Sequence, residues 1–255
     1  MIRSFTSFLS LIVLTVAIGA QVKKTEPPAI KPLFENSLQA VVVTTKDWDT
    51  VTATATLFER KNIKSDWKQV GESFPVVVGR SGLAWADLLN GDIDMTKIKQ
   101  EADGNSPAGM FPLTESFGTG SKPEAVELPY TKMEKFTECV NDVKSQFYNR
   151  IVNRMQVGNF DWKSSEKMLA EKDQYALGVF VAYNSYPVEK GRGSCVFLHV
   201  WRDAGLGTSG STTMERRNLE RIVGWASPKK NPYLIQMPKD IYEKRIKTWK
   251  LPKLK

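Results

Sequence analysis

Runs of hydrophobic residues along the chain predict a mainly β fold. Six segments are rich in β-branched and aromatic residues, and several of them alternate apolar with polar positions between Gly, Pro or polar residues. Such segments are typical of strands that bury one or both faces. The predicted strands are residues 38–45, 51–58, 74–79, 175–183, 194–201 and 233–237.

Helical patterns are fewer, so we expect helices only at the flanks of the sheet. The clearest one follows Thr212 and Glu215, whose spacing is that of a capping box, and it ends at Pro228. Two weaker patterns cover residues 133–143 and 164–173. The predicted core face of the clearest helix consists of Leu219, Ile222, Val223 and Ala226.

The N-terminus has the pattern of a secretory signal. Arg3 gives a positive start, residues 5–18 are mostly apolar, and the segment ends in small residues at Ala20. We therefore predict a signal peptide over residues 1–20 and a periplasmic or extracellular location in the cell envelope. An uncleaved membrane anchor is the alternative, although the apolar run falls short of the ~20 residues that span a bilayer. Residues 21–37 are polar and proline-rich and are expected to form a tether before a domain at 38–238.

Positive charge is concentrated at the C-terminus. The chain has 36 Lys and Arg against 28 Asp and Glu, a net charge of +8. Residues 239–255 hold seven basic and two acidic residues, and seven minus two leaves +5 in this tail. The tail could contact anionic wall polymers or lipid headgroups, or it could form a terminal helix docked through Ile241, Tyr242 and Ile246. Nucleic acid is not an expected partner, because the chain is predicted to be exported and its charge lies in one tail.

The chain contains one histidine and two cysteines. These cannot form the usual zinc sites, so we expect neither a metal nor another cofactor. Histidine chemistry must involve His199, which lies on a predicted strand with Cys195 on the same face. The segment 208–213 is rich in Ser, Thr and Gly and precedes the clearest helix. It is expected to place a hydroxyl at a helix N-terminus, where backbone N–H groups favour a nucleophile and an oxyanion.

Two segments carry a resemblance to a known family. Residues 193–199 (GSCVFLH) and 208–214 (TSGSTTM) resemble the core motif of the L,D-transpeptidase catalytic domain, in its proteobacterial-type branch. Four further blocks resemble that branch in the same order: residues 67–85, 101–118, 139–150 and 162–168. Together the blocks cover most of residues 67–238.

The resemblance implies a mixed β-sandwich that acts on peptidoglycan stem peptides. In this family a cysteine thiolate, with a histidine as base, attacks the amide after the L-centre of a diamino acid and expels D-alanine. The acyl-enzyme is resolved by another stem's amine, by a lysine or by water. In this chain His199 matches the family histidine and Ser211 the nucleophile. The implied oxyanion donors are the backbones of Gly210 and Thr212, and the implied substrate contacts are Thr208, Ser209 and Thr213.

Ser211 departs from the family, which has cysteine at this position. A thiol ionises near pH 8.5, whereas a hydroxyl must lose its proton as it attacks. Serine enzymes usually add an acid that orients the histidine, but Asp203 is four residues from His199, and Ser209 stands where better-known members carry a second histidine. Three hypotheses stay open: a serine acyltransferase, a catalytically degenerate stem-peptide-binding or regulatory module, and a natural cysteine replaced by Ser211.

Cys139 and Cys195 are predicted to form a disulfide, because an exported chain with two cysteines favours one bond. Two separate buried thiols are the alternative. Cys195 is not expected to be a relocated nucleophile, because four strand residues would hold it ~13 Å from His199.

We predict that export yields a mature chain starting near Gln21, because the apolar segment has the length and flanks of a signal peptide. Intact mass measurement of the exported protein tests this. A mature species that still contains residues 9–18 would show an anchored protein instead.

Overall fold

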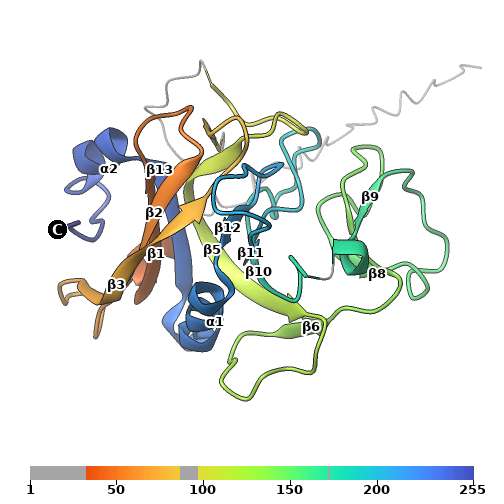
Figure 1. Ribbon diagram of the computed structural model, residues 1–255, viewed down its shortest axis with the longest axis horizontal. Coiled ribbons are helices and arrows are strands. Elements are labelled where there is room, and N and C mark those ends of the chain that lie inside the picture. The colour runs from red at the N-terminus through yellow and green to blue at the C-terminus, as the bar shows by residue number, and fades with distance from the viewer. Residues whose placement is uncertain (1–32, 87–96, 172) are drawn as a thin grey trace, which may run out of the picture. The chain divides into compact units, whose positions relative to one another are not determined.

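A computed structural model describes residues 33–86, 97–171 and 173–255 of the chain. Most of its regular structure is β, which confirms the prediction of a mainly β fold (Figure 1). The strands are β1 (Gln39–Thr45), β2 (Thr52–Glu59), β3 (Lys68–Val77), β4 (Leu83–Trp85), β5 (Ser106–Gly118), β6 (Tyr130–Lys132), β7 (Thr137–Val140), β8 (Ile151–Asn153), β9 (Ser165–Lys167), β10 (Leu177–Val181), β11 (Phe197–Val200), β12 (Thr212–Met214) and β13 (Pro232–Pro238). The helices are α1 (Arg216–Trp225) and α2 (Lys239–Arg245), with 3-10 turns η1 (Leu33–Asn36), η2 (Met168–Glu171) and η3 (Pro228–Lys230).

Ten strands form one large mixed sheet. Its order is β10-β11-β12-β3-β2-β1-β13-β5-β4, and β6 also pairs with β5. Because β10 pairs with β5 as well, the sheet closes on itself in a barrel-like arrangement. The pairs β1 with β13 and β11 with β12 are parallel, whereas β1 with β2 and β2 with β3 are antiparallel.

The six predicted strands are all present, with shifted ends. β3 starts six residues before the predicted segment, and β11 covers only the last part of residues 194–201. The longest strand, β5, was not predicted. It contains Pro107, Gly109 and Pro112, which obscure a strand pattern, yet it pairs with β13, β10 and β4.

Helix α1 confirms the predicted helix and its start after Glu215, but the predicted capping box does not form. Leu219, Ile222 and Val223 are buried as expected. Thr212 belongs to strand β12, and Glu215 occupies the N-cap position without a side-chain capping hydrogen bond. The pairing of β12 with β11 and β3 outweighs the local capping-box pattern.

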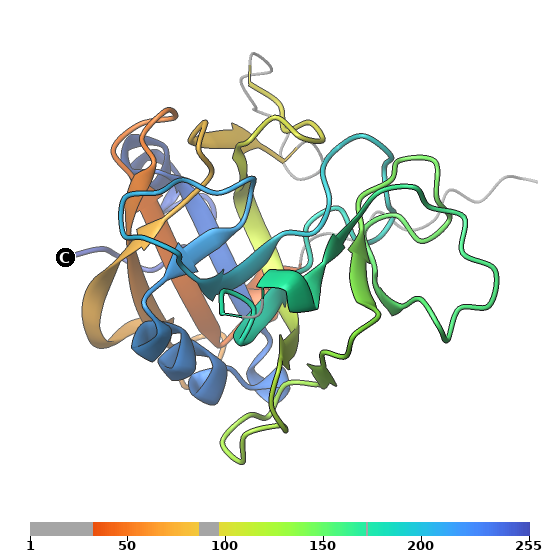
Figure 2. The same cartoon turned by 45° about the vertical axis from the view of Figure 1, so that its right-hand side comes forward.

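A small three-stranded sheet includes residues from both segments in which the weaker helices were predicted. Residues 133–143 contain β7, and residues 164–173 contain β9 and η2, so both predictions are wrong. The order is β8-β7-β9, and Figures 1 and 2 show this small sheet (green) to one side of the large sheet.

The buried carboxylate of Glu138 in β7 holds its neighbours: it forms ion pairs with Arg154 (2.8 Å) and Lys167 (2.7 Å). Although burial opposes ionisation, these partners and other donors lower the pKa of Glu138 to about 2.

A disulfide joins the small sheet to the large one. Cys139 in β7 is bonded to Cys195, two residues before β11, which confirms the predicted pairing. Around the bond lies a second hydrophobic cluster, separate from the main core. Its other buried members are Phe117, Met133, Met168, Tyr175 and Phe197.

Both ends of the described chain pack against the sheet. Residues 21–32 of the expected tether, and the predicted signal peptide, lie outside the described residues. The tether prediction is wrong from η1 onward, because Phe34 is buried and stacks on Trp67. At the other end Tyr242 of α2 is fully buried and donates a hydrogen bond to the carbonyl of Pro252 (2.7 Å), so the basic tail is docked on the body. Among the described residues, no helix has the length and hydrophobicity to span a membrane.

We predict that replacing both cysteines (Cys139→Ala with Cys195→Ala) lowers the free energy of unfolding by about 3 to 4 kcal/mol. The disulfide closes a loop with a sequence separation of 56, and its loss restores that entropy to the unfolded chain. Urea denaturation of the oxidised protein and of the double variant measures the difference. An unchanged transition midpoint would contradict the prediction.

Candidate functional site

One cleft of about 710 Å³ contains nearly all the predicted site residues. The strand β11, the loop before β12 and the segment 99–102 contribute to its lining. The structure therefore brings together residues from separate parts of the chain. The predicted residues that line it are His199, Thr208, Ser209, Gly210, Ser211 and Thr213.

Thr212 is the exception among the predicted residues. Its side chain is buried away from the cleft, where its hydroxyl donates a hydrogen bond to Oε1 of Gln236 (2.6 Å). This contact anchors β12 to β13. The side chain of Thr212 is therefore structural.

The parallel pairing of β11 and β12 places the side chains of His199 and Ser211 on the same face of the sheet. His199 lies opposite Thr213 in the register of β11 and β12. Side chains two residues apart in extended chain point to the same side, so Ser211, which directly precedes β12, lies on the face of Thr213 and His199. All three line the cleft.

Ser211 lines the cleft and is held in place by hydrogen bonds. Its Oγ accepts from the N–H of Phe197 (3.1 Å), and its carbonyl accepts from the hydroxyls of Thr208 (2.6 Å) and Ser106 (3.0 Å). The side chain is buried, with 7% of the residue exposed. These contacts fix the position of Ser211 from three different segments.

The predicted helix N-terminus at Ser211 is wrong. Helix α1 starts at Arg216, and the whole of strand β12 lies between it and Ser211. The N–H of Gly210, one of the expected oxyanion donors, donates to Oγ1 of Thr208 (3.0 Å). Charge stabilisation at Ser211 therefore cannot come from a helix that begins there.

His199 is buried and neutral at physiological pH. Its Nδ1 donates to the carbonyl of Val200 (2.9 Å), and the ring of Tyr175 packs edge-on with centroids 4.9 Å apart. Burial lowers the pKa of His199 to about 4, although backbone hydrogen bonds to Val200 and Gln174 oppose this shift. A backbone carbonyl thus orients the imidazole. Asp203, considered as the orienting acid, is exposed and accepts from the N–H of Gly205 (3.0 Å).

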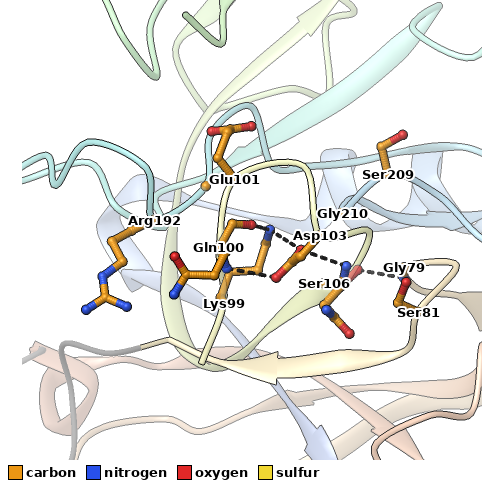
Figure 3. A network of polar contacts seen from close by, with 12 residues as sticks. Gly79, Ser81, Lys99, Gln100, Glu101, Asp103, Ser106, Arg192, Ser209 and Gly210 are labelled. Carbon is orange, nitrogen blue, oxygen red and sulfur yellow. Dashed lines mark hydrogen bonds and ion pairs between the residues drawn. The ribbon is translucent and has the colours of Figure 1, made fainter. Parts of the chain in front are cut away.

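A loop that was not assigned a role from the sequence lies next to the segment that contacts Ser211. Asp103 accepts hydrogen bonds from Lys99 Nζ (2.6 Å) and from the N–H groups of Gln100 (2.8 Å) and Asn105 (2.9 Å) (Figure 3). Burial raises the pKa of Asp103, but these donors outweigh burial and lower it overall. The Asp-Gly turn that follows in the sequence is the only local signal of this loop.

Ser106 follows this loop in the chain and connects it to Ser211 by a hydrogen bond. Its Oγ accepts from the N–H of Gly79 (2.8 Å) (Figure 3). The same hydroxyl donates to the carbonyl of Ser211 (3.0 Å). Sequence reasoning missed Ser106, because no pattern of spacing links residues 79, 106 and 211. Among the described residues, no group of three or more His, Cys, Asp and Glu side chains is arranged to hold a metal ion.

Comparison of the chain with protein-family models, with curated proteins and with solved structures finds no match.

We predict that the imidazole of His199 titrates with a midpoint near pH 4 in the folded protein, because burial disfavours its charged form. Since the unfolded chain takes up this proton at higher pH, the contribution of His199 to stability falls as pH decreases from about 6.5 to 4. The C2 proton of the single histidine can be followed by NMR, with the urea-unfolded protein as the control. A folded midpoint near 6.5 would contradict the burial described above.

Proposed function

We propose that the cleft is the stem-peptide site of an L,D-transpeptidase-like protein of the cell envelope, in which residue 211 holds the nucleophile position and His199 the base position. One observation carries the proposal. The two segments that resemble the family motif, 193–199 and 208–214, contribute neighbouring parallel strands, and His199 and Ser211 line the same cleft. The mainly β, mixed sheet is compatible with the family's β-sandwich-like fold.

The proposed reaction is acyl transfer from a stem peptide. The Oγ of Ser211 attacks the carbonyl carbon of the amide that follows the L-centre of the diamino acid, and its proton passes to His199. The C–N bond breaks, and His199 returns the proton to the departing amine of D-alanine. The ester that remains is resolved by the amine of another stem, by a lysine or by water. A neutral His199 is in the protonation state that this base requires.

A second candidate function is a stem-peptide-binding module without turnover. The low pKa of His199 favours it, because an imidazole that binds protons weakly is a poor base for a hydroxyl. A backbone carbonyl, and not a carboxylate, orients the imidazole. A thiol needs less help from its base, so this geometry suits cysteine better than serine.

We predict that Ser211→Cys creates or strongly increases L,D-acyl transfer, and that His199→Ala lowers the rate of either form by about 100-fold or more. The thiol supplies an ionisable nucleophile at a position already fixed by the contacts of Ser211. Mass spectrometry of protein incubated with muropeptide tetrapeptides detects the acyl adduct and the released D-alanine. Acylation of the thiol form by a carbapenem gives a second measurement.

Ser209→Cys is the matched control, because it places a thiol in the same loop and cleft but two residues from the nucleophile position. Because it keeps Ser211, it is expected to release D-alanine no faster than the unmodified protein. If folded Ser211→Cys neither acylates nor processes a tetrapeptide, the acyltransfer proposal is wrong. If the unmodified protein processes stems as fast as Ser211→Cys, the non-catalytic alternative is wrong.

A further inference from the structure

Arg80 lies at the cleft, beside the loop that carries Ser211. It is exposed, follows the end of β3, and its Nη1 donates a hydrogen bond to Oγ of Ser209 (3.2 Å). Only Gly210 separates Ser209 from Ser211 in the chain. The guanidinium therefore lies next to the proposed nucleophile position.

The backbone of Arg80 is fixed to the same loop. Its N–H donates to the carbonyl of Thr208 (2.8 Å), and the N–H of Thr208 donates to the carbonyl of Val78 (3.0 Å). Gly207 passes so close that a Cβ there would lie 2.4 Å from the Cα of Arg80. Because of these contacts, the distance between the base of the Arg80 side chain and the loop is set by the fold.

Among the described residues, Arg80 differs from the two lysines that line the cleft in its lack of an ionic partner. Lys99 is paired with Asp103 (2.6 Å) and Lys167 with Glu138 (2.7 Å). Within the part of the chain that the structure describes, Arg80 forms no ion pair. One of its five N–H donors contacts Ser209, and a guanidinium offers the others as a planar fork that fits a carboxylate.

Acidic groups of the cleft already accept hydrogen bonds from neighbouring hydroxyls. Glu101 accepts from Ser194 Oγ (2.8 Å) and from the hydroxyl of Tyr148, and Glu166 accepts from the hydroxyl of Tyr175 (2.7 Å). These carboxylates are thus stabilised where they are and need no ion pair with Arg80. The guanidinium is left to bind an anion that enters the cleft.

We propose that Arg80 binds the C-terminal carboxylate of the stem peptide and so selects a terminal residue as the leaving group. This inference rests on the proposed function. The leaving residue is attached to the reacting carbonyl through its amine, and its own carboxylate is only two bonds beyond that nitrogen. A cation beside Ser211 can therefore reach this carboxylate when the carbonyl is at Oγ. A peptide that continues beyond this residue, or that ends in an amide, lacks the charge.

The test compares two synthetic tetrapeptide stems that differ only at the C-terminus, one a free carboxylate and one an amide. Their affinities for the unmodified folded protein are measured by isothermal titration calorimetry, with mass spectrometry to detect turnover. We expect the carboxylate form to bind about tenfold tighter or more, the usual advantage of a hydrogen bond to a charged group. Arg80→Met should bind both stems with the affinity of the amide, and Arg80→Lys should keep part of the preference.

Arg217→Met is the matched control, because Arg217 is an exposed arginine of α1 outside the cleft lining. It should keep the full preference for the carboxylate. If the unmodified protein binds both stems equally, or if Arg80→Met keeps the preference, the role of Arg80 is wrong while the stem-peptide site stands. If the folded protein binds neither stem, the proposed function itself is wrong, and the role of Arg80 falls with it.

Discussion

The parallel pairing of β11 with β12 is the constraint on which the candidate site depends. Parallel neighbours cannot be joined by a tight turn, so the chain must leave β11 and return by a longer connection before β12 begins. That connection, residues 201–211, supplies the Thr208–Ser211 side of the cleft. The same pairing holds His199 and Thr213 opposite each other, so that an imidazole and a hydroxyl from separate segments share one surface.

Contacts from outside these strands fix the rest of the site. The segment after β3 binds the loop through Val78 and Arg80, and Ser106 at the start of β5 binds the carbonyl of Ser211. Tyr175, a member of the hydrophobic cluster around the disulfide, packs edge-on against His199. The burial that results makes the imidazole a weak base that stays neutral at pH 7. The site is thus well ordered but chemically better matched to a thiol than to a hydroxyl.

Charge in the cleft is organised in a similar way. The two lysines that line it are paired with acids, Lys99 with Asp103 and Lys167 with Glu138. Such pairs hold loops and strands, because separating either partner would leave a charge without compensation. Arg80 is held by its backbone, and its exposed side chain forms no ion pair within the described residues, which suits the proposed ligand-binding role.

The sequence by itself determined the mainly β class, the six strand segments, the buried face of α1, the cysteine pair and the candidate residues His199 and Ser211. These features follow from local periodicity, from composition and from a motif, which can all be recognised without knowing which distant residues are in contact. Tertiary structure alone decided that β5 is a strand despite its prolines, that residues 133–143 form part of a small sheet, and that Ser211 precedes a strand and not a helix. The physical reason is that strands are stabilised by hydrogen bonds to distant partners. The identity of those partners, such as Gln236 for Thr212 and Ser106 for Ser211, is not encoded in any local pattern.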